Sequence, residues 1–104
     1  EAIAAAKGGI EAMVRAAAAS YASRGLRINA IAPSLTDTPL SQAIIGSEQA
    51  LEISKRMHPT GDVGEASDVA SLAAWLHSDQ AKFVTGQTFV IDGGISKIVP
   101  KPKV

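Results

Sequence analysis

Leu26-Arg27-Ile28-Asn29-Ala30-Ile31-Ala32-Pro33 is typical of a short strand that a proline ends. Apolar residues predominate from Leu26 to Ala32, and Pro33 has no backbone N–H to continue a ladder. Thr88-Phe89-Val90-Ile91 predicts a second strand, which Asp92-Gly93-Gly94 closes. Since helical segments separate the two strands, the sequence predicts parallel α/β layering.

A long helix is expected before the first strand. The segment from Glu1 to Arg24 places apolar side chains at helical spacing, and Gly25 fits the end of a helix. Glu1 already has the character of a helix interior, so we expect the sequence to begin within an element. The spaced apolar residues are Ile3, Ile10, Val14, Ala17 and Tyr21.

Three further helical segments are expected between the strands. Thr38-Pro39 has the pattern of a helix start with proline in the first turn, and Gly46 interrupts that segment. The next helix is expected from about Ser47 to Met57, before a break at His58-Pro59-Thr60-Gly61. The last helix, which Ser67 could cap, places Val69, Leu72, Ala73 and Leu76 on one face.

Composition limits the class of protein. The 104 residues are 46% hydrophobic and 19% charged, which predicts one globular unit or part of one. Residues 95–104 hold three lysines and two prolines, which predict a solvated tail after a unit of residues 1–94. The formal net charge is zero, so no global field attracts nucleic acid or an anionic membrane. No cysteine is present, which is compatible with a reducing cytoplasm. No apolar run approaches the roughly 20 residues of a membrane span.

The two expected strands cannot form a buried sheet alone. Each would leave one row of backbone donors and acceptors unpaired. Either an N-terminal part outside this sequence supplies more strands, or identical chains associate through the apolar helices.

Five local sequences, in this order, carry a resemblance to a known family. Together they resemble the C-terminal portion of the short-chain dehydrogenase/reductase family as far as Gly94. They are Ala6-Lys7-Gly8-Gly9-Ile10-Glu11, then Leu26–Pro33, then Pro33-Ser34-Leu35-Thr36-Asp37-Thr38-Pro39, then Gly64-Glu65-Ala66-Ser67-Asp68-Val69-Ala70, and finally Phe83-Val84-Thr85-Gly86-Gln87-Thr88 with Val90-Ile91-Asp92-Gly93-Gly94.

The resemblance implies a fold, a cofactor and an activity. The fold would be part of a Rossmann-like, doubly wound parallel sheet that binds NAD or NADP at the carboxyl ends of its strands. The reaction would be that of an oxidoreductase acting on a carbonyl or alcohol. The family forms dimers or tetramers, and the alanine-rich first helix and Trp75 are consistent with a homo-oligomer.

The resemblance also implies site residues. Lys7 would be both the catalytic lysine and a ligand of the nicotinamide ribose hydroxyls, because an ammonium is a compact triple donor. The loop that would border the nicotinamide consists of Pro33, Ser34, Leu35, Thr36 and Thr38. An apolar substrate side would be lined by Leu40, Ile44 and Ile45.

The chain departs from the family at several positions. Ile3 stands four residues before Lys7, where the family has its catalytic tyrosine. Tyr21 is no substitute, because it lies 14 positions after Lys7, roughly 20 Å along the helix. Ser34 replaces the glycine of the family's Pro-Gly pair, and Asp62 stands where arginine is frequent. The Gly-rich phosphate loop, the first strands and the catalytic serine are not in this sequence.

These departures leave three interpretations open. The first is an oxidoreductase relative whose C-terminal part, taken alone, is inactive and binds NAD weakly or not at all. The second is a non-catalytic module for oligomerisation or interaction, and the third is a nucleotide-binding sensor without turnover. A metal site is not expected, because His58 and His77 lack metal-ligand spacing.

Overall fold

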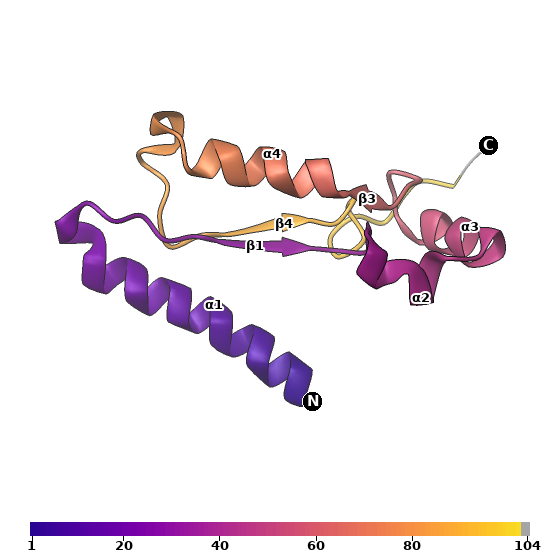
Figure 1. The fold of residues 1–104 in the computed structure, drawn as a ribbon, viewed down its shortest axis with the longest axis horizontal. Coiled ribbons are helices and arrows are strands. Elements are labelled where there is room, and N and C mark those ends of the chain that lie inside the picture. Colours follow the sequence, from indigo (N-terminus) through magenta and orange to yellow (C-terminus); the bar gives the residue numbers. More distant parts are fainter. Residues whose placement is uncertain (103–104) are drawn as a thin grey trace. The chain divides into compact units, whose positions relative to one another are not determined.

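The computed structural model describes residues 1–102 (Figure 1). These residues form two compact units, each built from two stretches of sequence. The first unit combines Glu1–Ile31 with Leu72–Phe89, and the second combines Ala32–Ser71 with the residues from Val90 onward. The division expected from the sequence, a unit of residues 1–94 and a tail of residues 95–104, stays a prediction.

Helices and strands alternate along the chain. The helices are α1 (Ala2–Tyr21), α2 (Gln42–Ile45), α3 (Glu48–Met57) and α4 (Ala66–Leu76), with 3-10 turns at Ala22–Arg24, Pro39–Ser41 and Asp79–Ala81. The strands are β1 (Ala30–Pro33), β2 (Thr36–Asp37), β3 (Gly64–Glu65) and β4 (Thr88–Ile91). This order confirms the predicted α/β class.

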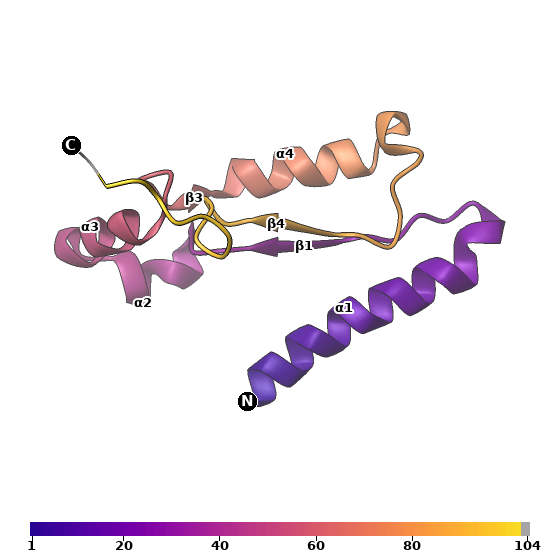
Figure 2. The same cartoon turned by 180° about the vertical axis from the view of Figure 1, so that it is seen from behind.

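Both pairs of strands are parallel. The Ala30 amide donates to the Gln87 carbonyl over 2.8 Å, and the Ser34 amide donates to the Ile91 carbonyl over 2.8 Å. Both partners advance in the same direction, as the arrows of β1 and β4 do in Figure 2. Strand β2 pairs with β3, with Thr36 opposite Gly64. The β2–β3 pair is too short to leave a sequence pattern and was not predicted.

Strand β1 begins at Ala30, four residues later than the sequence predicted. Before it, the Ile28 amide donates to the Thr85 hydroxyl over 3.1 Å, and the Asn29 amide group donates to the Val84 carbonyl over 3.1 Å. The Asn29 side-chain oxygen accepts from the Gln87 amide at 3.1 Å. These two side chains, Asn29 and Thr85, form a polar clamp beside one backbone hydrogen bond, which the Gly86 amide donates to the Ile28 carbonyl over 2.8 Å.

The apolar face predicted for α1 is mostly exposed in this chain. Val14 and Ala18 are buried, whereas Ile3 is 75% exposed and Ile10 is 48% exposed. Ala18 lies beside Gly86, where an added Cβ would be 3.5 Å from the alanine methyl group. The helix therefore approaches Gly86 through Ala18 in its C-terminal half, whereas Ile3 and Ile10 in its N-terminal half are exposed to solvent.

Most of the predicted helix boundaries are confirmed. Thr38 is the N-cap of the turn that begins at Pro39, and the Ser47 hydroxyl accepts from the Ala50 amide at 3.1 Å to cap α3. The predicted cap of α4 was wrong. Ser67 lies inside the first turn, and the Asp68 carboxylate accepts from the Glu65 amide at 2.8 Å.

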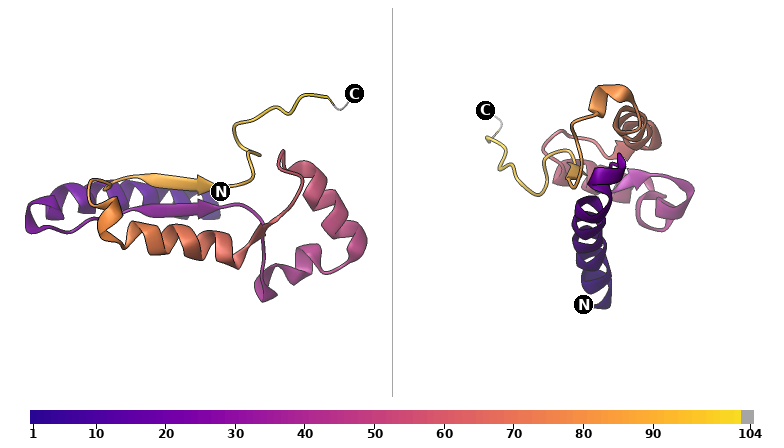
Figure 3. Two further views of the ribbon diagram at one scale, coloured as in Figure 1. Left: turned by 90° about the horizontal axis from the view of Figure 1, so that it is seen from above. Right: turned by 90° about the vertical axis from the view of Figure 1, so that its left-hand side faces the viewer.

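Residues 95–102 contain a turn and then irregular chain, which Figure 3 shows as the yellow segment after β4. In the described part of the chain, no helix has the length and apolar content needed to cross a membrane.

Candidate functional site

The predicted cofactor loop, Pro33–Thr38, leaves the carboxyl end of β1 in the second compact unit. Its backbone is held from two sides. The Ser34 amide donates to Ile91 at the end of β4, and the Leu35 carbonyl accepts from the Gly64 amide at 3.0 Å. The Thr36 hydroxyl donates to the Ser34 carbonyl over 2.9 Å. The sequence therefore folds this loop as a fixed segment at a strand end.

Ser41 fixes the far end of the loop. Its hydroxyl donates to the Thr36 carbonyl over 2.7 Å and accepts from the Thr38 amide at 3.0 Å. Ser41 is itself buried, so water competes little for these bonds. These two hydrogen bonds of Ser41 fix the direction in which the chain enters the turn at Pro39 and then α2.

The predicted substrate residues fall into two environments. Leu40 is 92% exposed and Ile44 is 59% exposed, whereas Ile45 is buried at 5%. Within this unit Leu40 and Ile44 present apolar surface to solvent, while Ile45 belongs to the core. Their proposed role in lining a substrate stays a prediction.

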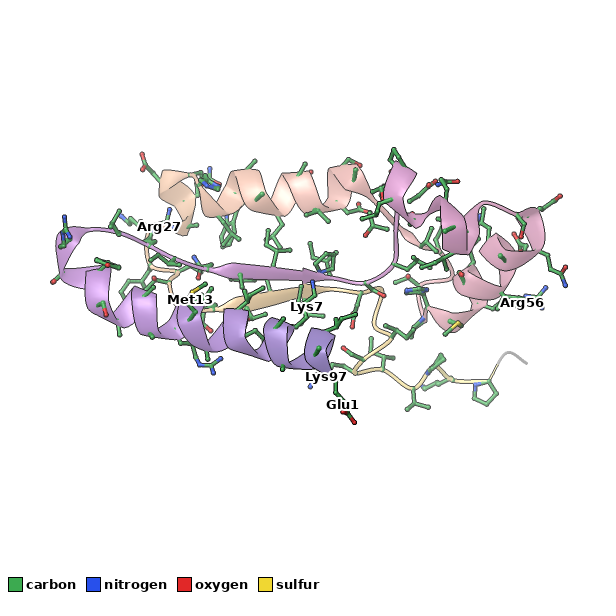
Figure 4. All side chains as sticks on the ribbon, turned by 60° about the horizontal axis from the view of Figure 1, so that its bottom comes forward. Glu1, Lys7, Met13, Arg27, Arg56 and Lys97 are labelled. Atoms are coloured by element: carbon green, nitrogen blue, oxygen red, sulfur yellow. The ribbon has the colours of Figure 1, made fainter. Side chains whose placement is uncertain are left out.

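Lys7 lies on α1 in the first compact unit, with an exposed side chain (Figure 4). Ile3 precedes it by one helical turn, and residues four apart in a helix share a face. Ile3 is 75% exposed and carries no titratable group. The structure thus places the predicted catalytic lysine beside an aliphatic side chain, with no phenol at the preceding turn.

A cavity of about 360 Å³ lies beside the loop in the second unit. Its lining includes Ser34 and Leu35 from the loop, together with His58 and Asp92. Asp62, Glu65 and Asp68 also line it. Within residues 1–102 no group of three or more histidine, aspartate or glutamate side chains could hold a metal ion.

Asp62 stands where the short-chain dehydrogenase/reductase family often has arginine, and it has a neighbouring cation. Its carboxylate lies 3.8 Å from the Lys55 ammonium and accepts from the Val63 amide at 2.9 Å. The Asp62 side chain is 68% exposed, so this ion pair contributes little to stability. The reversed charge is nevertheless balanced locally rather than left alone.

Sequence reasoning considered His58 only as a metal ligand and so missed its environment. The ring is 5% exposed, with Nδ1 at 2.8 Å from the Ser54 carbonyl and Nε2 at 3.0 Å from the Ser34 hydroxyl. One signal was present in the sequence. A histidine just after a helix, four residues beyond a helical carbonyl, is placed to bond that free carbonyl.

Asp92 closes β4 through a hydrogen-bonded turn. Its carboxylate accepts from the Ser96 hydroxyl and from the Gly94 amide, the latter at 2.9 Å. These donors favour the ionised form, so they hold the pKa of Asp92 below its ordinary value, with the Ser96 hydroxyl as the largest cause.

We expect the Asp92 turn to weaken in acid. Because the folded pKa is depressed, its stabilisation is present above the ordinary value of 3.8 and is lost as the pH falls through the folded pKa. Carboxyl ¹³C NMR should give a lower titration midpoint for Asp92 than for a peptide of residues 90–98. Ser96→Ala should raise that midpoint; an unchanged midpoint would contradict the assignment of cause.

The chain is similar to known proteins over nearly all of its length. The family profile described as Enoyl-(Acyl carrier protein) reductase matches residues 1–96. A 3beta-hydroxysteroid dehydrogenase 1 from Eggerthella lenta is 44% identical over 93 residues, which cover 89% of this chain and 36% of that protein. The chain therefore spans a little over a third of the length of the curated relatives it matches.

Solved structures share the fold. A 4-hydroxyisoleucine dehydrogenase complexed with NADH matches with a TM-score of 0.84 and 28% identity, covering 91% of this chain and 39% of that one. A gluconate 5-dehydrogenase from Burkholderia cenocepacia, in complex with NADP and tartrate, matches with a TM-score of 0.83 and 29% identity, covering 92% and 38%. These likenesses confirm the predicted fold, the C-terminal helices and last two strands of a doubly wound parallel sheet.

Proposed function

Because the chain belongs to the short-chain dehydrogenase/reductase family, we propose that the natural protein containing it is an NAD- or NADP-dependent oxidoreductase. It would transfer hydride between the nicotinamide and a carbonyl or alcohol substrate. The observation that carries the proposal is the loop Pro33–Thr38, which leaves the carboxyl end of a parallel strand and is held there by β4 and Gly64. In open α/β sheets, ligands bind at that end of the strands.

The proposed roles follow from the chemistry of each side chain. Lys7 would donate to the ribose hydroxyls, because its ammonium is exposed and carries three hydrogens. Pro33, Ser34, Leu35, Thr36 and Thr38 would form the border of the nicotinamide. Leu40 and Ile44, both exposed, would offer an apolar side to the substrate.

The cofactor chemistry requires groups beyond these residues. A dinucleotide pyrophosphate needs backbone donors from a Gly-rich loop at a helix N-terminus, and the sequence of these 104 residues holds no such motif. We therefore expect residues 1–104 on their own to bind NAD or NADP weakly or not at all, and to be inactive.

A second candidate function rests on Ile3. Since an exposed aliphatic side chain stands one turn before Lys7, a non-catalytic module that retains the fold for oligomerisation or interaction is the alternative. Dinucleotide binding and turnover, measured separately, distinguish an enzyme, a sensor and such a module.

Replacing Lys7 tests the oxidoreductase proposal. We expect Lys7→Met in the natural protein to weaken NADH or NADPH binding about tenfold, the effect of losing a charge-assisted hydrogen bond. Arg15→Met, which removes an exposed cation two turns further along α1, is the matched control and should leave binding unchanged. Fluorescence titration of the reduced nucleotides measures both. A wild-type protein that binds neither nucleotide contradicts the proposal and favours the module.

The proposal includes a homo-oligomer, a dimer or a tetramer, in the cytoplasm. Exposed apolar side chains support association through α1, where Met13 is 65% exposed, and through α4 and β4, where Trp75 is 39% and Val90 is 54% exposed. The lack of cysteine is consistent with a reducing compartment.

A further inference from the structure

His58 joins the end of α3 to the predicted cofactor loop through one imidazole ring. Nδ1 lies 2.8 Å from the carbonyl of Ser54, a buried residue of α3. Nε2 lies 3.0 Å from the Ser34 hydroxyl, on the first residue after β1. These three residues, Ser34, His58 and Ser54, are called the Ser34–His58–Ser54 bridge below.

The chemistry of the two contacts sets the direction of each hydrogen bond. A backbone carbonyl only accepts, so Nδ1 of His58 carries the hydrogen and donates to Ser54. In the neutral ring, Nε2 then keeps its lone pair, and the Ser34 hydroxyl is the donor. The bridge is therefore a directed chain from the loop, through the ring, to the helix.

The ring has little freedom to turn away from these partners. It is 5% exposed, and Gly93 lies against it: a Cβ added to Gly93 would be 3.4 Å from both Cβ and Cδ2 of His58. The Thr60 amide donates to the Gly93 carbonyl over 3.1 Å, which holds Gly93 next to the ring. Rotating this buried imidazole would break both of its hydrogen bonds.

Ser34 uses all of its polar groups within this unit. Its amide donates to Ile91, its carbonyl accepts from the Thr36 hydroxyl at 2.9 Å, and its hydroxyl donates to His58. A glycine, the residue of the resembling family at this place, would keep the first two bonds and lose the third. The hydroxyl of Ser34 thus adds a restraint on the loop that the family pattern does not contain.

We propose that the Ser34–His58–Ser54 bridge positions the loop Pro33–Thr38 for the nicotinamide, which makes Ser34 and His58 positioning residues of the dinucleotide site. The inference rests on the proposed function. Ser34 acts through His58 by fixing where the neighbouring backbone groups lie, so its hydroxyl need not touch the cofactor. The helix that follows the substrate side, α3, is thereby linked to the cofactor side of the site.

The test uses the natural protein, with Ser34→Ala as the main variant. We expect Ser34→Ala to raise the dissociation constant of NADH or NADPH about 3- to 10-fold, as for one hydrogen bond between neutral groups. Ser34→Thr, which keeps a hydroxyl, should restore wild-type affinity. Ser78→Ala is the matched control, because it removes a serine hydroxyl that bonds the Trp75 carbonyl in the other unit.

A double-variant cycle tests whether the two residues act as one unit. His58→Asn keeps a donor near the Ser54 carbonyl but removes the acceptor for Ser34. We expect Ser34→Ala combined with His58→Asn to bind no more weakly than the weaker single variant, because both remove the same bond. Effects that add would overturn the bridge, even if each variant melts at the wild-type temperature.

Long-range ¹H–¹⁵N NMR of the imidazoles gives a readout that a general packing role would not move. We expect the ring hydrogen of His58 on Nδ1, which faces the Ser54 carbonyl, and a shift of the Nε2 resonance in Ser34→Ala. His77 serves as the internal reference, since its Nδ1 makes the same contact, at 2.8 Å, with the Ala73 carbonyl. An unchanged Nε2 resonance, or an Nε2–H form in the wild type, would overturn the proposal.

These experiments distinguish a failure of the proposed function from a failure of the positioning role. A wild type that binds neither nucleotide contradicts the proposed function and, with it, the positioning role. A wild type that binds, with Ser34→Ala binding equally well, contradicts the positioning role alone.

Discussion

If the proposed oxidoreductase function is right, a tyrosine introduced at Ile3 is expected to raise the rate of alcohol oxidation about 10²- to 10⁴-fold, the usual contribution of a general acid–base group. The physical reason lies in α1. Position 3 is one turn before Lys7 on the same helix face, so a phenol there would feel the ammonium, which favours its ionised form. Ile3 is 75% exposed, so a larger ring can be accommodated there.

Ile3→Phe is the matched control, because it adds the ring without the hydroxyl. The measurement is NAD or NADP reduction with a panel of secondary alcohols, at saturating cofactor. We expect Ile3→Tyr to gain turnover and Ile3→Phe to remain at the wild-type rate. Equal rates in the two variants would mean that the phenol is not what limits the reaction, and would favour the non-catalytic module.

Gly93→Ala is expected to lower the free energy of unfolding by about 2 to 3 kcal/mol. Gly93 has a φ of 59°, a left-handed conformation that costs a residue with a side chain about 1 to 2 kcal/mol. The new methyl group would also lie 2.6 Å from the Thr60 hydroxyl oxygen and 3.4 Å from the His58 ring. Overpacking of this kind adds about 1 kcal/mol or more.

Gly61→Ala separates the two contributions. Gly61 has a φ of 83°, and an added Cβ would meet nothing within 4 Å, so only the backbone cost remains. We expect about 1 kcal/mol for this control, from urea unfolding of the natural protein followed by circular dichroism. Equal losses for the two variants would show that the space around His58 and Thr60 does not limit residue 93.

Sequence reasoning predicted the elements whose bounds are set by residues close by in the chain. The strand Thr88–Ile91 was predicted with its observed bounds, and α3 was predicted to within one residue at its start. Thr38 and Gly46 acted at the helix ends where their chemistry suggested. In each case the deciding contact lies within a few residues, so composition and spacing are sufficient.

The elements that depend on distant partners could not be predicted from spacing. The residues before Ala30 bond to side chains and backbone groups at positions 84–87, and nothing local distinguishes them from a strand. The apolar pattern of α1 correctly predicted a helix, but it did not reveal that Ile3 and Ile10 are exposed in this chain. Periodicity identifies a face, not what covers it.

The candidate site was predicted by resemblance, and its internal support was not. The five matching local sequences identified Lys7 and the loop Pro33–Thr38 as candidates, and the comparisons confirm the family. The contact between Ser34 and His58 joins residues 24 positions apart, through a substitution that the family pattern lacks. Only the folded chain brings that hydroxyl and that ring together.

The polar clamp also affects the order in which the molecule folds. Asn29 bonds the Val84 carbonyl and the Gln87 amide, which lie 55 and 58 positions further along the chain. Closing so large a loop has an entropic cost that must be met before these bonds form, whereas α1 and α3 need only local contacts. We therefore expect the helices to form early and the pairing of β1 with β4 to follow later. During that interval the edges that later pair β1 with β4 are also open to other chains, which favours aggregation.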